Sequence, residues 1–184
     1  MDFKILWQGN FAKVISPKDH PYEAFHEGNG VMIVPIINGK IGIRKEFCPP
    51  YLVKNDTGKT LFYTLITGMI DEDDATPMDA ALRELKEEAG IVVKEYKPLY
   101  AIEDIPEAKS NTRHIGLYVL DIKDYRRIGI KGDGTEYEEK SETIWVSPYQ
   151  LAQIVIHEKN IDFLLVSAYF ILKEISNNNF LWSW

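Results

Sequence analysis

Short runs of apolar residues alternating with polar ones, separated by turn-forming residues, predict β-strands over much of this chain. The clearest case is Val31–Phe47, where two β-rich segments flank Asn38-Gly39. Because Asn-Gly readily adopts positive φ angles, it favours a type I′ turn, and the run is predicted to form a hairpin. Pro35 has no backbone N–H to donate, so it indicates an edge position or a bulge.

Other runs with the same pattern predict further strands. Ile5–Ser16 is predicted to form a pair of short strands near the N-terminus. Single strands are predicted at Leu61–Ile66, Tyr100–Ile102, Ile115–Ile122 and Thr143–Val146.

Helices are fewer, and their start signals are local. Thr76 followed by Pro77 supplies a capping hydroxyl and a proline at the first helical position, and Gly90 supplies a stop. These signals predict a helix over Pro77–Ala89. Ser147 followed by Pro148 predicts a second helix, and Asn160 or Asp162 opens a third that extends to Leu172. Strands and helices in this order predict the α+β class, without regular βαβ alternation.

Length and composition restrict the possible partners. A chain of 184 residues with 45% hydrophobic and 27% charged residues is expected to fold as one domain. The net charge of −7 argues against broad binding to nucleic acid or to an anionic membrane, since both need clustered basic residues. Cys48, the only cysteine, suits a reducing compartment, and the N-terminus lacks signal-peptide features, so we expect a cytoplasmic protein.

The predicted helix Pro77–Ala89 carries an unusual group of acids. At about 100° per residue, Glu84, Glu87 and Glu88 fall on one arc beside the apolar stripe, while Lys86 points away. A solvated surface face is the simplest interpretation. It explains the arc poorly, because like charges four residues apart destabilise a helix by roughly 0.2–0.5 kcal/mol. Three convergent carboxylates are instead typical ligands for a hard divalent cation such as Mg²⁺ or Mn²⁺.

The segment from Gly68 to Ile91, "GMIDEDDATPMDAALRELKEEAGI", resembles the Nudix box. That signature is Gly, five residues, Glu, seven residues, then Arg-Glu-apolar-x-Glu-Glu-x-Gly-apolar. The second half matches throughout, from Arg83 to Ile91. The first half departs from it, because Gly68 lies one residue too far from Arg83 and the expected Glu is replaced by Asp74 or lost at Ala75.

The remaining sequence resembles one branch of that family, the ADP-ribose and nucleoside-diphosphate-sugar pyrophosphatases. "KEFCPP" is similar to the branch's Gln-Tyr-Arg-Pro-Pro, and Pro106 follows the box at the spacing where the branch has a proline. The chain departs from the branch at Cys48, where an arginine is common, at Thr64, where a glutamate is common, and at Ile105-Pro106-Glu107, which replaces Ser-Pro-Gly.

The resemblance implies a fold and an assembly. It implies an α/β/α sandwich with a mixed sheet between helices, preceded by a small N-terminal antiparallel sheet. Residues 1–29 would supply that small sheet and form a homodimer, and residues 30–184 would form the Nudix hydrolase domain.

The resemblance also implies a magnesium-dependent pyrophosphohydrolase that acts on a small nucleotide. Glu84, Glu87, Glu88 and the carbonyl of Thr67 would hold the metal, and Arg83 would orient the glutamates. A glutamate of the loop 132–142 would act as the general base, with Glu139 favoured and Glu138 next, although a solvated acidic loop explains these residues equally well. Arg44, Lys45 and Arg113 offer enough positive charge for a short diphosphate, which favours a nucleoside-diphosphate sugar, ADP-ribose included. The alternative function is a Nudix-fold sensor that binds nucleotide without turnover.

Overall fold

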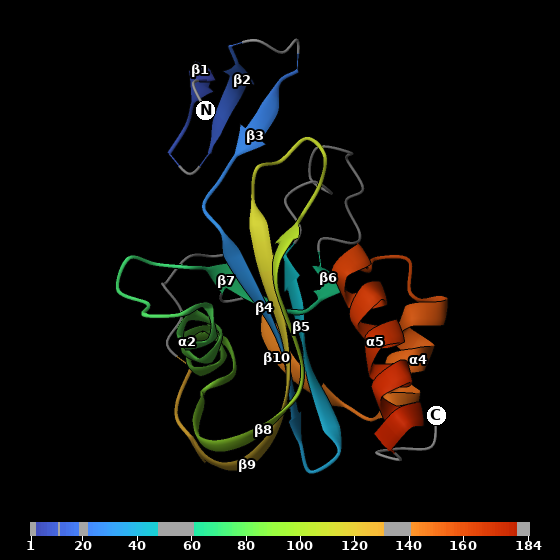
Figure 1. Cartoon of the computed structure of the whole chain (residues 1–184). Coiled ribbons are helices and arrows are strands. Elements are labelled where there is room, and N and C mark those ends of the chain that lie inside the picture. Colours follow the sequence, from blue (N-terminus) through green and yellow to red (C-terminus); the bar gives the residue numbers. More distant parts are fainter. Residues whose placement is uncertain (1–2, 11, 19–21, 48–60, 131–140, 180–184) are drawn as a thin grey trace.

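The computed structural model describes residues 3–10, 12–18, 22–47, 61–130 and 141–179. A small three-stranded sheet stands apart at the N-terminal end, and a larger sheet lies between two helical layers (Figure 1). The small sheet consists of β1 (Phe3–Gln8), β2 (Lys13–Pro17) and β3 (Ala24–His26). The large sheet consists of β4 (Gly30–Ile37), β5 (Lys40–Phe47), β6 (Leu61–Thr64), β7 (Ile66–Met69), β8 (Ile91–Pro106), β9 (His114–Arg127) and β10 (Glu142–Val146). The helices are α2 (Pro77–Ala89), α4 (Pro148–His157) and α5 (Phe163–Asn179).

The large sheet is mixed, with the order β10-β5-β4-β9-β8, while β6 pairs with β5 and β7 with β4. The central pair β4–β9 is parallel and the other pairs are antiparallel. Helix α2 covers one face, and α4 and α5 cover the other (Figure 1). Each face therefore buries its own apolar cluster, around Leu85 on the α2 side and around Leu151 and Leu172 on the other. The α+β prediction and its α/β/α layering are confirmed.

The hairpin predicted at Val31–Phe47 is formed by β4 and β5. Asn38 and Gly39 have φ angles of 51° and 73°, as a type I′ turn requires. The expectation that Pro35 marks an edge position is wrong, because β4 is central in the sheet. Pro35 lies where β4 changes its antiparallel partner from β7 to β5, so no antiparallel ladder needs the missing N–H.

Helix α2 begins and ends where the sequence predicts. The Thr76 hydroxyl accepts a hydrogen bond from the backbone N–H of Asp79, and Gly90 takes the left-handed conformation with φ 64°. Helix α4 starts with a capping box between Ser147 and Gln150. Three elements are longer than predicted: β8 runs from Ile91 to Pro106, β9 continues to Arg127, and α5 continues to Asn179.

The N-terminal sheet exposes apolar side chains and is hydrogen-bonded to the main domain. The pair predicted at Ile5–Ser16 corresponds to β1 and β2, and β3 adds a strand that the sequence did not predict. The backbone N–H of Phe25 in β3 donates to Ser110 O at 2.7 Å, and Thr112 N donates to Phe25 O at 2.9 Å. The small sheet is therefore tied to the loop that precedes β9.

Within the described residues, each helix is either too short or too polar to span a lipid bilayer.

Candidate active site

The acidic helix α2 packs closely against strand β7, and a glycine makes this possible. A Cβ on Gly68 would coincide with the carboxyl group of Glu84. Ala80, one turn earlier on the same face of α2, is also small and is fully buried. The side chain of Glu84 is only 12% exposed as a result, so its carboxylate lies between helix and sheet. Burial raises the pKa of Glu84, opposed by its hydrogen bond from Arg83.

Arg83 holds two of the predicted metal ligands. Its Nη1 atom donates to Glu84 Oε1 at 2.7 Å and to Glu87 Oε2 at 3.2 Å. Its Nη2 atom donates to the carbonyl of Met69 at 2.7 Å. One guanidinium therefore contacts both carboxylates and the end of β7. That Arg83 orients these carboxylates for a metal stays a prediction.

Asp74 is the partner that completes the Arg83 network. Its Oδ1 and Oδ2 atoms accept hydrogen bonds from Arg83 Nε at 3.2 Å and Nη2 at 2.9 Å, a two-point contact. The Asp74 side chain is 8% exposed, and it also accepts a hydrogen bond from the Asp71 backbone N–H. Of the two alternatives for the first half of the box, the structure selects Asp74, since its carboxylate meets the box arginine despite the one-residue insertion.

This contact makes a pH-dependent contribution to stability. Hydrogen bonding from Arg83 holds the pKa of the Asp74 carboxyl below its ordinary value of about 3.9. Stabilisation from a depressed carboxyl pKa is complete above the unfolded-state pKa and is lost as the pH falls through the folded-state pKa. We expect Asp74→Asn to lower the Tm at pH 7 by on the order of 2–4 °C, the shift from about 1 kcal/mol in a chain of this size.

Calorimetry of wild type and Asp74→Asn between pH 7 and pH 2 checks this expectation. The difference in Tm should be constant above about pH 5 and should shrink below about pH 4. A difference that does not change with pH would show that the Asp74 charge contributes nothing.

Glu88, the third carboxylate, is held by Arg44 instead of Arg83. The Arg44 side chain is buried, with its Nε atom 3.4 Å from Glu88 Oε2 and 3.6 Å from Glu46 Oε2. Arg44 Nη1 also donates to the Glu88 carbonyl at 3.2 Å, and Thr143 Oγ1 donates to the same carbonyl at 2.8 Å. Arg44 on β5 and Thr143 on β10 thus both contact the C-terminal turn of α2. Arg44 also lies close enough to the Glu88 carboxylate to position it. Its predicted contact with substrate stays a prediction.

The other predicted binding residues lie on neighbouring elements. Lys45 follows on β5, with its Nζ atom 5.9 Å from the centre of the Tyr63 ring. Arg113 lies across Gly30, where a Cβ would collide with its guanidinium, and its Nη1 atom is 3.5 Å from Glu27 Oε2. The proposed bases Glu138 and Glu139 lie outside the described residues, as does Cys48.

The oxygen atoms of the predicted ligands are of the kind that binds a divalent cation, although their side chains do not converge on a single point. Within the described parts of the chain, no three His, Cys, Asp or Glu side chains already form a ready metal site. Glu84 and Glu87 nevertheless accept hydrogen bonds from the same Arg83 nitrogen, Nη1. The Thr67 carbonyl lies next in sequence to Gly68, against which Glu84 packs. Carboxylate and carbonyl oxygens are the ligands that Mg²⁺ and Mn²⁺ prefer. The residues present therefore fit the metal.

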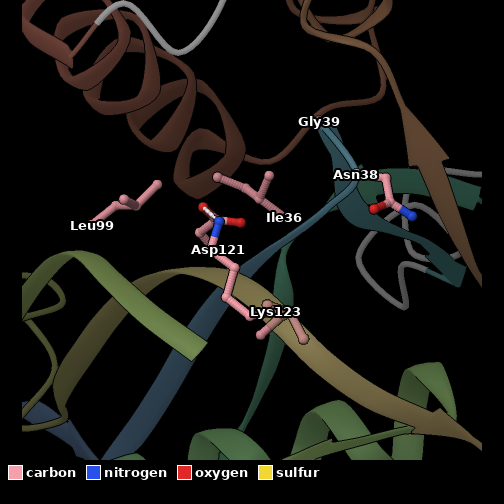
Figure 2. Close-up of a pocket in the computed structure, with 7 residues that line it drawn as sticks. Ile36, Asn38, Gly39, Leu99, Asp121 and Lys123 are labelled. Carbon is pink, nitrogen blue, oxygen red and sulfur yellow. Dashed lines mark hydrogen bonds and ion pairs between the residues drawn. The ribbon is translucent and has the colours of Figure 1, made fainter. Parts of the chain in front are cut away.

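Two cavities lie at opposite ends of β4. One, of about 160 Å³, is lined by Thr67, Arg113 and Glu46 among others, and Glu46 lies 3.6 Å from the Arg44 that contacts Glu88 of the acidic helix. The other, of about 290 Å³, lies at the Asn38-Gly39 turn (Figure 2). There, the carboxylate of Asp121 already pairs with Lys123 at 2.5 Å. Of these two cavities, the first is placed to accept part of a molecule bound at the glutamates.

Sequence reasoning did not single out Glu46 or Asp162 as site residues, although both line the cavity beside Thr67. Asp162 was visible only as a candidate helix cap. Its contact with Thr64 joins residues that are 98 positions apart in the sequence. Local sequence patterns cannot predict a contact over that separation.

Comparison with known proteins agrees with this geometry. The sequence model of the NUDIX domain matches residues 28–165. A comparison with curated proteins finds no match. Among solved structures, one described as "Crystal structure of ADP compounds hydrolase" is similar with a TM-score of 0.67 and 19% identity, over 97% of this chain and 94% of that chain. The motif, the acidic helix and the domain match agree, and the chain therefore belongs to the Nudix family and is a Nudix hydrolase.

Proposed function

We propose that this protein is a magnesium-dependent pyrophosphohydrolase that cleaves the diphosphate of a nucleoside diphosphate linked to another group. The observation that carries the proposal is the single guanidinium of Arg83, which contacts both Glu84, packed against Gly68, and Glu87. Nudix hydrolases generally use divalent metals, and this arrangement presents two carboxylates to one cation.

The chain's own residues would act mainly by positioning. Glu84, Glu87 and Glu88 would hold the cation, which supplies charge neutralisation for the diphosphate and activation of water. Arg83 and Arg44 would keep the glutamates in place, so that little reorganisation is needed when substrate binds. A carboxylate committed to a cation is a poor proton acceptor, so the general base is expected elsewhere, with Glu139 and Glu138 as the sequence candidates.

For substrate we favour ADP-ribose or a nucleoside-diphosphate sugar. The solved structure with a similar fold is described as an ADP compounds hydrolase, which supports a nucleoside diphosphate as the common chemical unit. The net charge of −7 disfavours a long polyanion such as a 5′-triphosphate RNA.

A substrate panel with and without Mg²⁺ tests the proposal. ADP-ribose, sugar nucleotides, dinucleoside polyphosphates and NADH are incubated with the protein, and the products are identified by mass spectrometry. We expect Mg²⁺-dependent cleavage of the diphosphate in the sugar-bearing compounds. Binding of nucleotide without any product would instead establish the sensor function.

We further propose that the protein is a homodimer joined through the N-terminal sheet. Strand β1 is exposed along its whole length and carries Phe3, Ile5 and Trp7, the last with 56% of its surface exposed. Apolar side chains concentrated on one small sheet are typical of an interaction surface, since a monomer would leave them in water. The proposed small-molecule nucleotide substrate and this second copy are the only partners that we expect.

Light scattering checks the assembly. We expect a mass of two 21.2 kDa chains for the wild type and a shift toward one chain for Trp7→Ser. Phe163→Ser is the matched control, because Phe163 is also an exposed aromatic but lies on α5. A wild-type mass of one chain would contradict the dimer.

A further inference from the structure

The cavity beside Thr67 has a mixed polar lining that the proposed metal site does not explain. Its polar side chains come from separate elements: β5, β6 and the loops before β9 and α5. They belong to Glu46, Thr64, Glu107, Arg113 and Asp162. Glu46 connects this cavity to the acidic helix, because its Oε2 atom lies 3.6 Å from Arg44 Nε, which lies 3.4 Å from Glu88 Oε2.

The size of the cavity limits its occupant. A volume of about 160 Å³ is close to that of a cavity of ~150 Å³ that accepts a single benzene-sized ring. That space accepts one hydroxylated ring and excludes a base and a sugar together.

The charge of the cavity limits the chemistry of the occupant. Three carboxylates face one guanidinium, and Arg113 already lies 3.5 Å from a fourth carboxylate, that of Glu27. Such a lining repels phosphate. Ionised carboxylates only accept hydrogen bonds, so the cavity favours a neutral group that donates them, such as a sugar hydroxyl.

The Asp162 carboxylate is held by two hydrogen bonds and can accept more. Its Oδ2 atom accepts a hydrogen bond from Thr64 Oγ1 at 2.8 Å, and its Oδ1 atom accepts one from the backbone N–H of Leu164 at 3.1 Å. A carboxylate offers about four acceptor positions, so these two bonds leave about two. Because Thr64 is buried, the carboxylate is held rigidly.

Glu46 faces the same space as Asp162. Burial raises the pKa of Glu46, Arg44 opposes the rise, and the charge of Asp162 adds to it. Glu46 on β5 and Asp162, which directly precedes α5, both line this cavity.

We propose that this cavity is a subsite for the vicinal hydroxyls of a sugar attached to the diphosphate, with Asp162 and Glu46 as the hydrogen-bond acceptors. The buried Nε atom of Arg113, which has no hydrogen-bond partner among the described residues, would donate to a hydroxyl oxygen. This inference rests on the proposed function, because it assumes that the diphosphate lies at Glu84 and Glu87. Such a subsite would select diphosphates that carry a sugar over those whose second group lacks hydroxyls.

Asp162 also caps α5, since its Oδ1 atom accepts a hydrogen bond from Leu164 N. A test must therefore separate its effect on the helix from its effect on ligand binding. Serine is as good a helix cap as aspartate, so Asp162→Ser keeps the cap and removes the carboxylate from the cavity. Glu46→Gln removes the second charge at nearly constant volume. Asp121→Asn is the matched control, since Asp121 lines the other cavity at the far end of β4 (Figure 2).

The first experiment measures kcat/KM with ADP-ribose and with an ADP alkyl ester that lacks sugar hydroxyls. We expect Asp162→Ser and Glu46→Gln to lower kcat/KM for ADP-ribose by about 10- to 100-fold, the range for a lost hydrogen bond to a charged group. The value for the alkyl ester should stay within a few-fold, and Asp121→Asn should change neither. An equal fall with both substrates would show a purely structural effect and would overturn the subsite.

The second experiment measures binding without turnover, by calorimetry with ribose 5-phosphate and 2-deoxyribose 5-phosphate. We expect wild type to bind ribose 5-phosphate at least 10-fold more tightly and Asp162→Ser to lose this preference. Equal affinity of wild type for the two sugars would overturn the subsite. If wild type hydrolyses no nucleoside diphosphate but still prefers ribose 5-phosphate, the proposed function fails and the subsite stands.

Discussion

Replacing Glu87 by Gln should abolish hydrolysis while the fold and the Tm remain nearly unchanged. Glu87 is half exposed, and its recorded contact is the 3.2 Å ion pair with Arg83, so the neutral amide costs at most about 0.5 kcal/mol of stability. A metal at this site would stabilise developing charge by several kcal/mol. Weakening its ligand set should therefore reduce turnover by on the order of 10³-fold or more.

The measurement is kcat at saturating Mg²⁺ with the best substrate from the panel, together with Mg²⁺ affinity by calorimetry. Glu95→Gln, an exposed glutamate on β8, provides the control for charge removal alone. Full activity of Glu87→Gln would show that the carboxylates of the acidic helix do not take part in catalysis as proposed.

Replacing Gly68 by Ala should be nearly as damaging, although no functional group is removed. The new Cβ would occupy the place of the Glu84 carboxyl, so Glu84 must move away from β7 and from Arg83. A displacement of about 1 Å at a catalytic group can reduce the rate by 10²-fold. Overpacking of this kind usually costs 1–3 kcal/mol of stability as well.

Gly129→Ala is the control for this substitution, because a Cβ on Gly129 would meet nothing within 4 Å. We expect Gly68→Ala to lose activity by about 10²-fold and to have a lower Tm, and Gly129→Ala to resemble wild type in both. Retained activity in Gly68→Ala would mean that the position of Glu84 does not matter.

Local signals predicted much of this fold. Helix α2 is bounded by Thr76 and Gly90, whose effects act within one turn of the chain, and its limits match the prediction. The Asn38-Gly39 turn is equally local. For the same reason, the arc of glutamates could be placed from helical geometry alone.

The contacts between distant segments could not be predicted. The sequence suggested Arg44 only as a cation for the diphosphate. It could not show that pairing of β5 with β10 and packing against α2 bury Arg44 beside Glu88. Pro35 indicated an edge position or a bulge, because its missing N–H rules out a continuous ladder on that side. The exchange of β7 for β5 explains how it lies in a central strand. Strand β8 was shortened in the prediction because several irregularities in its pairing with β9 break the alternation of apolar and polar residues.

The hydrogen bonds between Phe25 and the loop before β9 have a consequence for how activity depends on enzyme concentration. That loop begins at Glu107 and ends at Arg113, both of which line the cavity beside Thr67. If β1–β3 join two copies as proposed, dissociation would loosen β3 and, through Ser110 and Thr112, the wall of that cavity. Specific activity would then fall on dilution, through a rise in KM for sugar-bearing substrates with kcat preserved, although the metal ligands belong to a different part of the chain.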